Sequence, residues 1–396
     1  MLLRRGILWL TLCLPLYGET VAGRWHAAVK TPSGEEAYFD LEVNHSGGEW
    51  QGMLINGRDR NVSSAGSFDG RKLRLEFNYW DGRLEADFEN GELRGAFTRQ
   101  SRKQVLARPF RARRTPLVSP ASAPSVDAGG EWILDVGEGG GKEMWLASFE
   151  QDGARLQGVL IPVSGDYGMH TGFVDGNRIL LTHFDGIRAT ILDARISDGR
   201  LVGTLKGSVS AMVTGRRPDK AGRQELNSSS LTTMKNPREA FRFSYPDLEG
   251  RVVSSTDARF RGKAVVVSIS GSWCPNCHDE AVVLRMLYDR YHAKGLEIVA
   301  LGFEYTGEKE RDLRQLRLFA EKYKLPYPVL LAGTTENAQQ TLGQLRNFRV
   351  YPTTLFIGKD GLVRRIHAGF EGPSTGARYA ALQQEMTQWV ESLLAE

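Results

Sequence analysis

The first half of the chain repeats its own residue pattern at a nearly constant spacing. Gly23-Arg-Trp25 returns 107 residues later as Gly130-Glu-Trp132. Further matches pair Gly52–Ile55 with Gly158–Ile161, Asn90–Gly95 with Asp198–Gly203, and Arg113-Arg114 with Arg216-Arg217. All offsets fall between 103 and 108 residues. A period of this kind indicates a tandem duplication, and it predicts two units of the same fold at residues 24–114 and 130–217.

Both units have the pattern of short antiparallel strands joined by tight turns. Residues 1–236 hold 31 of the 44 glycines, and dipeptides such as Asp69-Gly70 and Asp175-Gly176 mark hairpin turns. We expect two small all-β meander barrels, similar to the calycin group in their Gly-x-Trp opening and hairpin rhythm. Larger barrels of this kind hold a ligand in the mouth, so a binding protein whose β units carry the main role, with the second half of the chain as an accessory domain, stays an alternative function. Alternatively, the tryptophans plug the barrel ends, and the units only space or dock the rest of the chain.

The second half follows a different pattern. Residues 237–396 alternate strands with amphipathic helices, which is typical of an α/β domain. The segment 115–129 is rich in Pro, Ala and Ser, and the segment 218–236 is polar, so both are expected to be linkers. The predicted fold class is therefore multidomain, with two tandem all-β repeats followed by an α/β domain.

The first 23 residues have the layout of a secretory signal peptide. Two arginines precede the 12-residue apolar run Gly6–Tyr17, and small residues surround Ala22. Such a run is too short to span a bilayer as a helix. We therefore expect a cleaved leader and a periplasmic or other extracytoplasmic location, in preference to a lipid on Cys13 or an uncleaved anchor.

The charge of the chain excludes one class of partner. Lys and Arg exceed Asp and Glu by only 51 to 47, and no long basic run occurs. Nucleic acid is therefore not expected as a partner.

Without the leader, Cys274 and Cys277 are the only cysteines of the chain. They follow the β-branched run 264–269 and precede apolar residues at helical spacing, so the pair lies at a strand-to-helix junction. Thiol–disulfide exchange needs a thiolate, and the N-terminus of a helix lowers the pKa of a cysteine. We expect Cys274 to attack a partner disulfide as the nucleophile and Cys277 to resolve the mixed disulfide.

At these residues the chain resembles a known family. Trp273-Cys-Pro-Asn-Cys277 is similar to the active site of thioredoxin-fold proteins, and the surrounding sequence resembles their exported TlpA/ResA-type subfamily. The resemblance extends from Phe243 through Val350-Tyr-Pro-Thr-Thr354 to the helix after Ala377. It implies a thioredoxin-like fold for residues 237–396, with strands at 296–303 and 328–331 and a helix at 312–325.

The resemblance also implies roles for individual residues. Pro352 is expected to be cis and to lie beside the cysteines, so that Tyr351 and Thr353 help to hold an extended peptide. Glu280, three residues after Cys277, is expected to relay a proton. Trp273 completes the set of candidate catalytic residues, and no cofactor or metal is implied.

The resemblance implies partners as well. Protein thiols and disulfides are the expected substrates, and reduction is the expected direction, with electrons drawn from a membrane thiol donor. Members of the family commonly serve cytochrome c maturation, metal-site assembly or redox homeostasis in general.

Other chemistries use similar residues. Cys274-x-x-Cys277-His278 also matches the attachment motif of c-type haem, for which His367 or Met386 is the candidate second ligand. The tryptophan before the motif and the second motif around Pro352 favour thioredoxin chemistry over haem. Zinc would need a second ligand pair that the sequence lacks. Peroxidase chemistry is disfavoured because both cysteines share one Cys-x-x-Cys.

Overall fold

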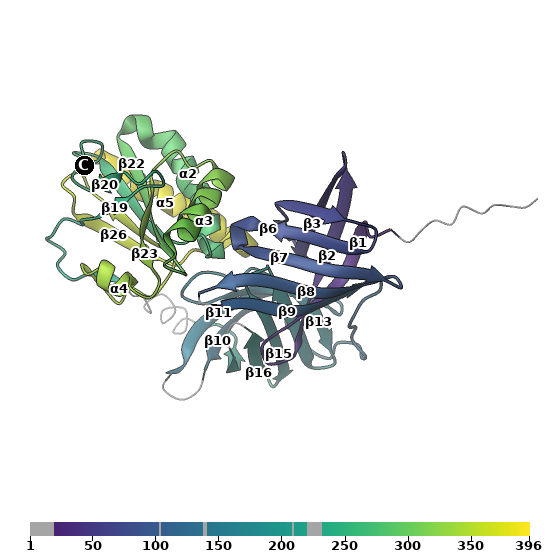
Figure 1. Cartoon of the computed structure of the whole chain (residues 1–396). Coiled ribbons are helices and arrows are strands. Elements are labelled where there is room, and N and C mark those ends of the chain that lie inside the picture. Colours follow the sequence, from purple (N-terminus) through teal and green to yellow (C-terminus); the bar gives the residue numbers. More distant parts are fainter. Residues whose placement is uncertain (1–19, 103, 138–140, 208–209, 220–231) are drawn as a thin grey trace, which may run out of the picture.

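The computed structural model describes residues 20–102, 104–137, 141–207, 210–219 and 232–396. Figure 1 shows a helix-containing α/β domain on one side and two β units packed together on the other. The expected signal peptide, residues 1–23, lies mostly outside the described residues, and Cys13 is among those not described. Most of the second expected linker also lies outside them.

The first β unit is a nine-stranded antiparallel sheet with the order β4-β3-β2-β1-β9-β8-β7-β6-β5. The unit comprises β1 Gly23–Lys30, β2 Glu36–Ser46, β3 Glu49–Asn56, β4 Asp59–Val62, β5 Ala65–Phe68, β6 Lys72–Phe77, the 3₁₀ helix η1 Asn78–Trp80, β7 Gly82–Glu89, β8 Glu92–Ser101 and β9 Gln104–Arg113. Long strands alternate buried and exposed residues, which buries one face of the sheet. This sheet does not close into the barrel that the sequence predicted, because β4 and β5 at its two ends do not pair with each other.

The second β unit is a closed eight-stranded antiparallel barrel, as predicted. Its strands are β10 Gly130–Val136, β11 Glu143–Asp152, β12 Arg155–Ile161, β13 Met169–Asp175, β14 Arg178–Phe184, β15 Ala189–Ser197, β16 Arg200–Gly207 and β17 Ala211–Arg216. Its interior is filled with apolar side chains, among them Trp132, Trp145 and Leu181. A barrel filled in this way is a packed core rather than a ligand container.

The two β units share a hydrophobic core, because the outer face of the barrel continues the core of the first sheet. Phe184 of β14 lies 5.0 Å from both Phe39 and Phe97, measured between ring centroids. Asn56 at the end of β3 exchanges two hydrogen bonds with the backbone of Phe184. The linker between the units therefore joins two bodies that are packed together rather than spaced apart.

The same kind of contact, an arginine side chain stacked on a tryptophan ring, lies at the start of each β unit. The Trp132 indole donates to the Ala128 carbonyl at 2.8 Å, and the Arg217 guanidinium lies 3.9 Å above the indole ring. In the first unit, Trp25 donates to Val21 at 2.9 Å, and Arg114 lies 3.7 Å above the ring. The tandem duplication remains an interpretation of the sequence, to which this shared arrangement adds a structural likeness.

The contacts at the start of the first unit bear on the expected end of the leader at residue 23. Val21 is fully buried in the core of the first unit, and Arg114 donates to the carbonyls of Thr20 and Ala22. Cleavage after Gly23 would remove these contacts. The end of the leader at residue 23 stays a prediction.

The α/β domain is built around a five-stranded sheet with the order β23-β22-β21-β25-β26. Strands β21, β22 and β23 are parallel, whereas β25 is antiparallel to both of its neighbours. The sheet strands are β21 Ala264–Ser270, β22 Leu296–Glu304, β23 Val329–Thr334, β25 Thr353–Ile357 and β26 Val363–Ala368. The helices are α2 Pro275–Tyr291, η3 His292–Lys294, α3 Lys309–Tyr323, α4 Ala338–Thr341, η4 Pro373–Thr375 and α5 Ala377–Ala395. Short pairs at the edge are β18 Thr233–Met234 with β24 Leu345–Arg346, and β19 Ser244–Pro246 with β20 Val252–Ser254.

This arrangement confirms the thioredoxin-like fold expected for the C-terminal part. Every residue of β21 and β22 is buried, which is why these segments are apolar runs rather than alternating patterns. The helical segment that starts at the Cys-x-x-Cys motif ends at Gly295, which adopts φ +102 after η3.

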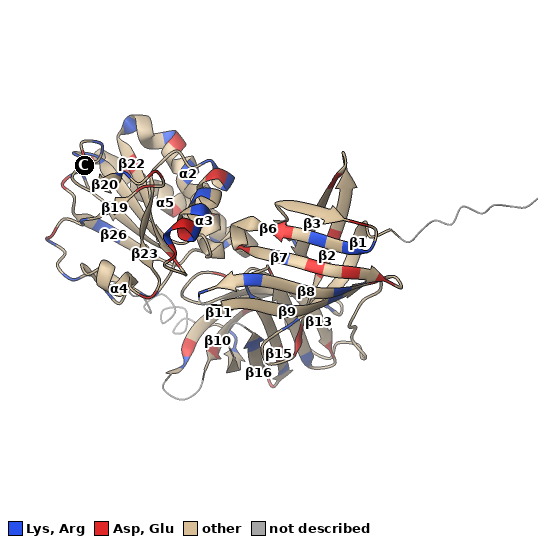
Figure 2. Cartoon of the chain, in the orientation of Figure 1, with Lys and Arg blue, Asp and Glu red and all other residues tan. Residues whose placement is uncertain are grey.

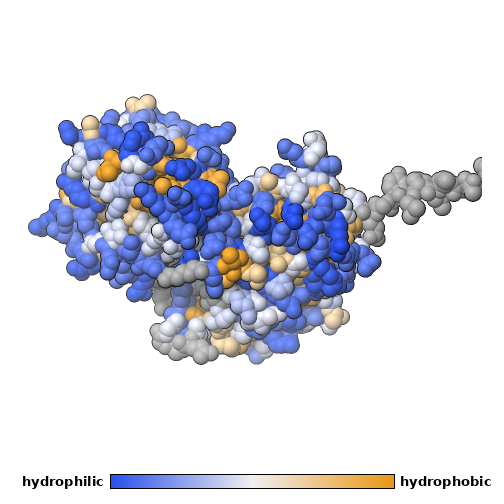
Figure 3. All heavy atoms as spheres, viewed as in Figure 1, coloured by the Kyte–Doolittle hydropathy of each residue, from blue (hydrophilic) through white to orange (hydrophobic). Residues whose placement is uncertain are grey.

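The outside of the molecule is largely polar. Figure 2 shows basic and acidic residues together on β6 and β7, where ion pairs such as Arg74–Glu85 and Arg83–Glu76 link the two strands. Figure 3 shows a mainly hydrophilic face with hydrophobic residues in small scattered groups. Among the described residues, no helix has both the length and the apolar character needed to cross a membrane.

The contact between Arg217 and Trp132 gives a test of the fold. Arg217 also donates to the carbonyls of Asp127, Gly129 and Glu131, so Arg217→Ala removes several charged hydrogen bonds together with the cation–π contact. We expect a local loss of about 1–3 kcal/mol. Hydrogen–deuterium exchange of the β10 amides should then be roughly tenfold faster or more. Arg155→Ala at the exposed start of β12 is the control, and equal exchange in both variants would contradict this role of Arg217.

Candidate redox site

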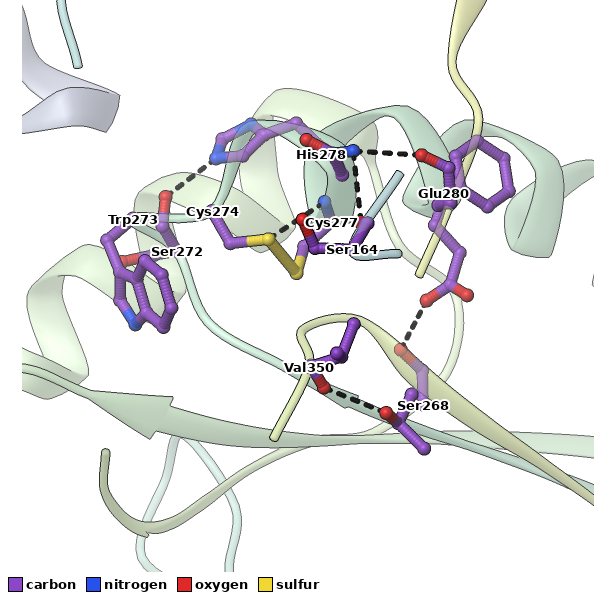
Figure 4. The surroundings of a disulfide bond; sticks show 12 residues. Ser164, Ser268, Ser272, Trp273, Cys274, Cys277, His278, Glu280 and Val350 are labelled. Atoms are coloured by element: carbon purple, nitrogen blue, oxygen red, sulfur yellow. Dashed lines mark hydrogen bonds between the residues drawn. A yellow bond between two sulfur atoms is a disulfide. The ribbon is translucent and has the colours of Figure 1, made fainter. Parts of the chain in front are cut away.

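The two cysteines lie at the junction between β21 and α2. The chain leaves the buried strand at Ser270, turns through Gly271–Trp273, and enters the helix with Cys274 as its N-cap residue. Cys274 and Cys277 form a disulfide, with their Cα atoms 5.2 Å apart. Figure 4 shows this bond between the start of α2 and the loop that carries Val350. The cysteine pair is therefore placed as the sequence predicted, at the beginning of a helix.

The start of the helix supplies the electrostatics that a thiolate needs. The Cys277 amide donates to the Cys274 sulfur at 3.2 Å. Pro275 occupies the first helical position, where no amide hydrogen is required. The free amides and the positive end of the helix dipole favour negative charge on the Cys274 sulfur once the disulfide is reduced.

Trp273 belongs to an aromatic cluster beside the disulfide. Its indole donates to the Phe303 carbonyl at 2.8 Å and stacks on Tyr305 at 4.5 Å between centroids. The Tyr351 ring packs edge-on against the indole at 5.2 Å. Trp273 and Tyr351 thus come together, although they are far apart in the sequence.

The second motif lies beside the first, at the start of β25. The peptide bond between Tyr351 and Pro352 is cis. The Thr353 hydroxyl is buried and donates to the Val350 carbonyl at 2.8 Å, so this side chain fixes the loop. The Pro352 carbonyl accepts from the Gly369 amide at 2.8 Å, which joins the loop to the end of β26.

Glu280 is buried beneath the helix, between two strands of the sheet. The Ser268 hydroxyl of β21 donates to one carboxyl oxygen at 2.6 Å, and the Thr354 hydroxyl of β25 donates to the other. Figure 4 shows the carboxyl group directed from α2 toward Ser268. Burial raises the pKa of Glu280 to about 7, and the two hydroxyl hydrogen bonds only partly offset that rise. Glu280 is therefore a group that exchanges a proton near neutral pH.

His278 is part of the core and does not point toward a ligand. One ring nitrogen bonds the Ser272 carbonyl at 2.7 Å, and the other bonds the Tyr323 hydroxyl at 2.8 Å. The Trp80 ring from the first β unit lies 4.1 Å from the imidazole. Burial holds the pKa of His278 well below its usual value, so the ring is neutral.

These contacts are the physical reason why the haem alternative does not fit. Both ring nitrogens of His278 are engaged, Met386 of α5 is fully buried, and His367 of β26 packs against the Trp389 ring at 5.5 Å between centroids. Among the described residues, no group of three His, Cys, Asp or Glu side chains is placed to hold a metal ion.

A second buried carboxyl group, not predicted from the sequence, lies near the motif. Glu304 at the end of β22 accepts from both the amide and the hydroxyl of Ser272, at 2.7 and 2.8 Å. Burial raises its pKa to about 7. Arg311 lies 3.4 Å from Glu304 and also pairs with Asp81 of the first β unit at 2.9 Å. An acidic residue directly after the apolar run 298–303 is the signal that points to Glu304.

Asn276, which lies between the two cysteines, was also not predicted as a site residue. Its side-chain amide donates to the carbonyls of Ser164, Asp166 and Phe370. Its oxygen accepts from Arg188 of the barrel at 2.8 Å. No signal in the sequence indicates that a residue of the redox motif contacts the barrel.

Comparison with known proteins identifies relatives of the C-terminal part of the chain. Residues 237–366 match the model of the AhpC/TSA family. Thiol-disulfide oxidoreductase ResA of Bacillus cereus is 33% identical over 131 residues, which cover 33% of this chain and 68% of ResA. The thioredoxin-like protein YneN of Bacillus subtilis (strain 168) is 32% identical over 127 residues, covering 32% of this chain and 68% of that protein.

Solved structures match the same part of the chain. The thiol:disulfide interchange protein of Chlorobium tepidum TLS is 21% identical, with a TM-score of 0.32, and the match covers 41% of this chain and 99% of that one. The identity to ResA and the share of ResA that is covered, together with the Cys-x-x-Cys at the start of α2, decide the family. Through its C-terminal domain, the chain belongs to the ResA family of thiol-disulfide oxidoreductases.

Proposed function

We propose that the protein is exported and reduces disulfides in protein substrates through Cys274 and Cys277. The observation that carries the proposal is the Cys274–Cys277 pair at the N-terminus of α2, with the buried carboxyl of Glu280 on the same helix. The apolar leader-like run near the N-terminus supports an extracytoplasmic location.

The proposed reaction starts from the reduced pair. The Cys274 thiolate attacks one sulfur of the substrate disulfide, a new bond forms between the two sulfurs, and the second substrate sulfur leaves and takes a proton. Cys277 then loses its proton and attacks the Cys274 sulfur, which releases the first substrate sulfur as a thiol. The substrate gains two electrons and two protons, and Cys274–Cys277 becomes a disulfide.

Glu280 is proposed to accept the proton that Cys277 loses. The two residues lie one turn apart on α2, and a pKa of about 7 suits a group that alternates between its two protonation states. Glu304 has a similar pKa, but its carboxylate is held by Ser272 and lies near Arg311. Glu280 is therefore the better candidate for the relay.

The loop around Pro352 is proposed to hold the substrate. The Tyr351 backbone would pair with an extended segment of the substrate, as the family resemblance implies, and Thr353 keeps that loop in place. Trp273 forms one wall beside Tyr351. Electrons would come from a membrane thiol donor, since an oxidising compartment supplies none.

The reduction potential tests the direction. For a reductase, equilibration of the mature protein with defined thiol buffers should give a value near about −270 mV, as in thioredoxin. A value near about −120 mV, as in DsbA, would make the protein an oxidant and overturn the proposed direction. Absence of a reducible disulfide in every buffer would overturn the function itself.

Trapping tests the roles of the two cysteines. Cys277→Ser leaves the attacking sulfur but removes the resolving one, so the variant should accumulate a mixed disulfide with a disulfide-containing protein. Non-reducing electrophoresis and mass spectrometry detect the adduct. The matched variant Cys274→Ser should form little or none, and an equal yield from both variants would refute the assignment of the nucleophile.

The pH dependence tests Glu280. The wild-type rate of substrate reduction should rise as the pH passes about 7, because the ionised carboxylate accepts the proton. Glu280→Gln should lose this rise and react on the order of 10²-fold more slowly. Glu304→Gln is the control that should keep the inflection, and an inflection that follows Glu304 would exclude the proposed relay.

The same variant has a defined effect on stability. The folded pKa of Glu280 lies above the ordinary value of 4.5, so burial of the neutral acid is tolerated below about pH 4.5. The contribution of Glu280 to the free energy of unfolding is then lost as the pH rises through 7, when the buried carboxyl group must ionise. The wild type should therefore lose stability relative to Glu280→Gln over this range.

A further inference from the structure

The redox pair is closed off from solvent in this arrangement of the chain. Cys274 is 4% exposed and Cys277 is 1% exposed. Exchange requires a partner sulfur to reach Cys274 directly, and reactive cysteines are ordinarily at least partly accessible. Something next to the motif must therefore move before a protein substrate can react.

The β12–β13 loop of the barrel, residues 162–168, is the segment that lies on the motif. Gly165 forms a parallel bridge with Phe370, and the Phe370 amide donates to the Ser164 carbonyl at 3.3 Å. Asn276 donates to the carbonyls of Ser164 and Asp166 at 3.3 and 3.0 Å. Figure 4 shows Ser164 among the residues that surround the disulfide. The loop thus pairs with the α/β domain as an added extended segment.

The two backbones are in direct contact. Gly165 has φ +101, and a Cβ atom there would overlap the carbonyl oxygen of Phe370. The loop is held at a second point, because the Asp166 carboxylate accepts from the Gly372 amide at 2.5 Å. A larger residue at position 165 is therefore incompatible with the docked loop.

Arg188, from the turn between β14 and β15, fixes the loop to the motif. Its guanidinium donates to the Asn276 side chain at 2.8 Å and to the Asp166 carbonyl at 2.9 Å. The group also lies 4.8 Å from the Tyr167 ring centroid, and its side chain is only 13% exposed. One buried cation thus connects the barrel, the loop and the residue between the two cysteines.

The docked loop occupies backbone groups that border the Pro352 loop. The Gly369 amide bonds the Pro352 carbonyl, and the next residue, Phe370, bonds the barrel loop. An extended substrate that pairs along this face meets the barrel loop already in place.

We propose that the β12–β13 loop is a cover over Cys274, and that Arg188 is the positioning residue that keeps it closed. The inference rests on the proposed function. The barrel then determines specificity, because a substrate reaches Cys274 only if it displaces this loop, and small or unrelated disulfides react slowly.

Two variants open the cover at two different contacts between the barrel and the α/β domain. Gly165→Ala introduces the overlap with Phe370, and Arg188→Met removes the hydrogen bonds to Asn276 and Asp166. The controls are Gly199→Ala, at a barrel turn with φ +72 and open space around it, and Arg195→Met on β15. Each control carries the same kind of change away from the motif.

The first readout is the rate at which N-ethylmaleimide alkylates Cys274 in the reduced full-length protein, followed by mass spectrometry. Gly165→Ala and Arg188→Met should react about tenfold faster than wild type or more, since each raises the population of the open loop. The controls should match the wild type. Equal rates in all five proteins would overturn the proposal, and so would faster alkylation in the controls alone.

The second readout separates this proposal from the proposed function. Reduction of a small aromatic disulfide should be faster in the two opened variants by a similar factor. If no variant exchanges with any disulfide while alkylation still differs, the oxidoreductase function fails and the cover stands. If exchange proceeds at one rate in all variants, the function stands and the cover fails.

Discussion

The redox site depends on the fixed position at which β21 ends. This strand is buried along its whole length and pairs with β22 on one side and β25 on the other, so it cannot shift without breaking two ladders. Its end places Cys274 at the start of α2. Its pairing with β25 places Ser268 opposite Thr354, and these two hydroxyls receive the Glu280 carboxyl. The cysteines, the carboxyl and the Pro352 loop are therefore all positioned by one register.

Two buried carboxyl groups lie on either side of this junction, and their partners differ. Burial raises the pKa of both Glu280 and Glu304 to about 7. Glu280 has only hydroxyl partners, which accommodate a neutral or an ionised group. Glu304 faces the Ser272 amide and Arg311, both of which favour the ionised form. Similar burial thus leaves one group suited to proton transfer and the other to holding the turn before the cysteines.

The β units are connected to the redox motif on two sides. Arg311 pairs with Asp81 of the first unit while it neighbours Glu304, and the Trp80 ring rests on His278. The barrel reaches Asn276 through Arg188 and the β12–β13 loop. Because the two β units also share a core around Phe184, all three bodies form one packed assembly in which the motif lies at the junction.

The sequence alone determined the local structures and the chemistry that depends on near neighbours. The apolar run 264–269 and the helical spacing after it predicted a strand-to-helix junction, and two cysteines three residues apart sufficed to indicate redox chemistry. The glycine-rich hairpin pattern predicted antiparallel β units, because turn chemistry and strand alternation are local properties. Whether such a sheet closes is not local, and among the described residues no strand ladder joins the two ends of the first sheet, where a closed barrel was expected.

The tertiary structure alone decided which distant residues complete the site. Ser268, Thr354 and Glu280 meet through strand register, and Asn276 meets Arg188 through the packing of the barrel on the α/β domain. His278 matched a haem motif by spacing, yet packing engages both of its ring nitrogens. Contacts between segments that lie about a hundred residues apart depend on how whole sheets pack. The residues around a motif do not predict that packing.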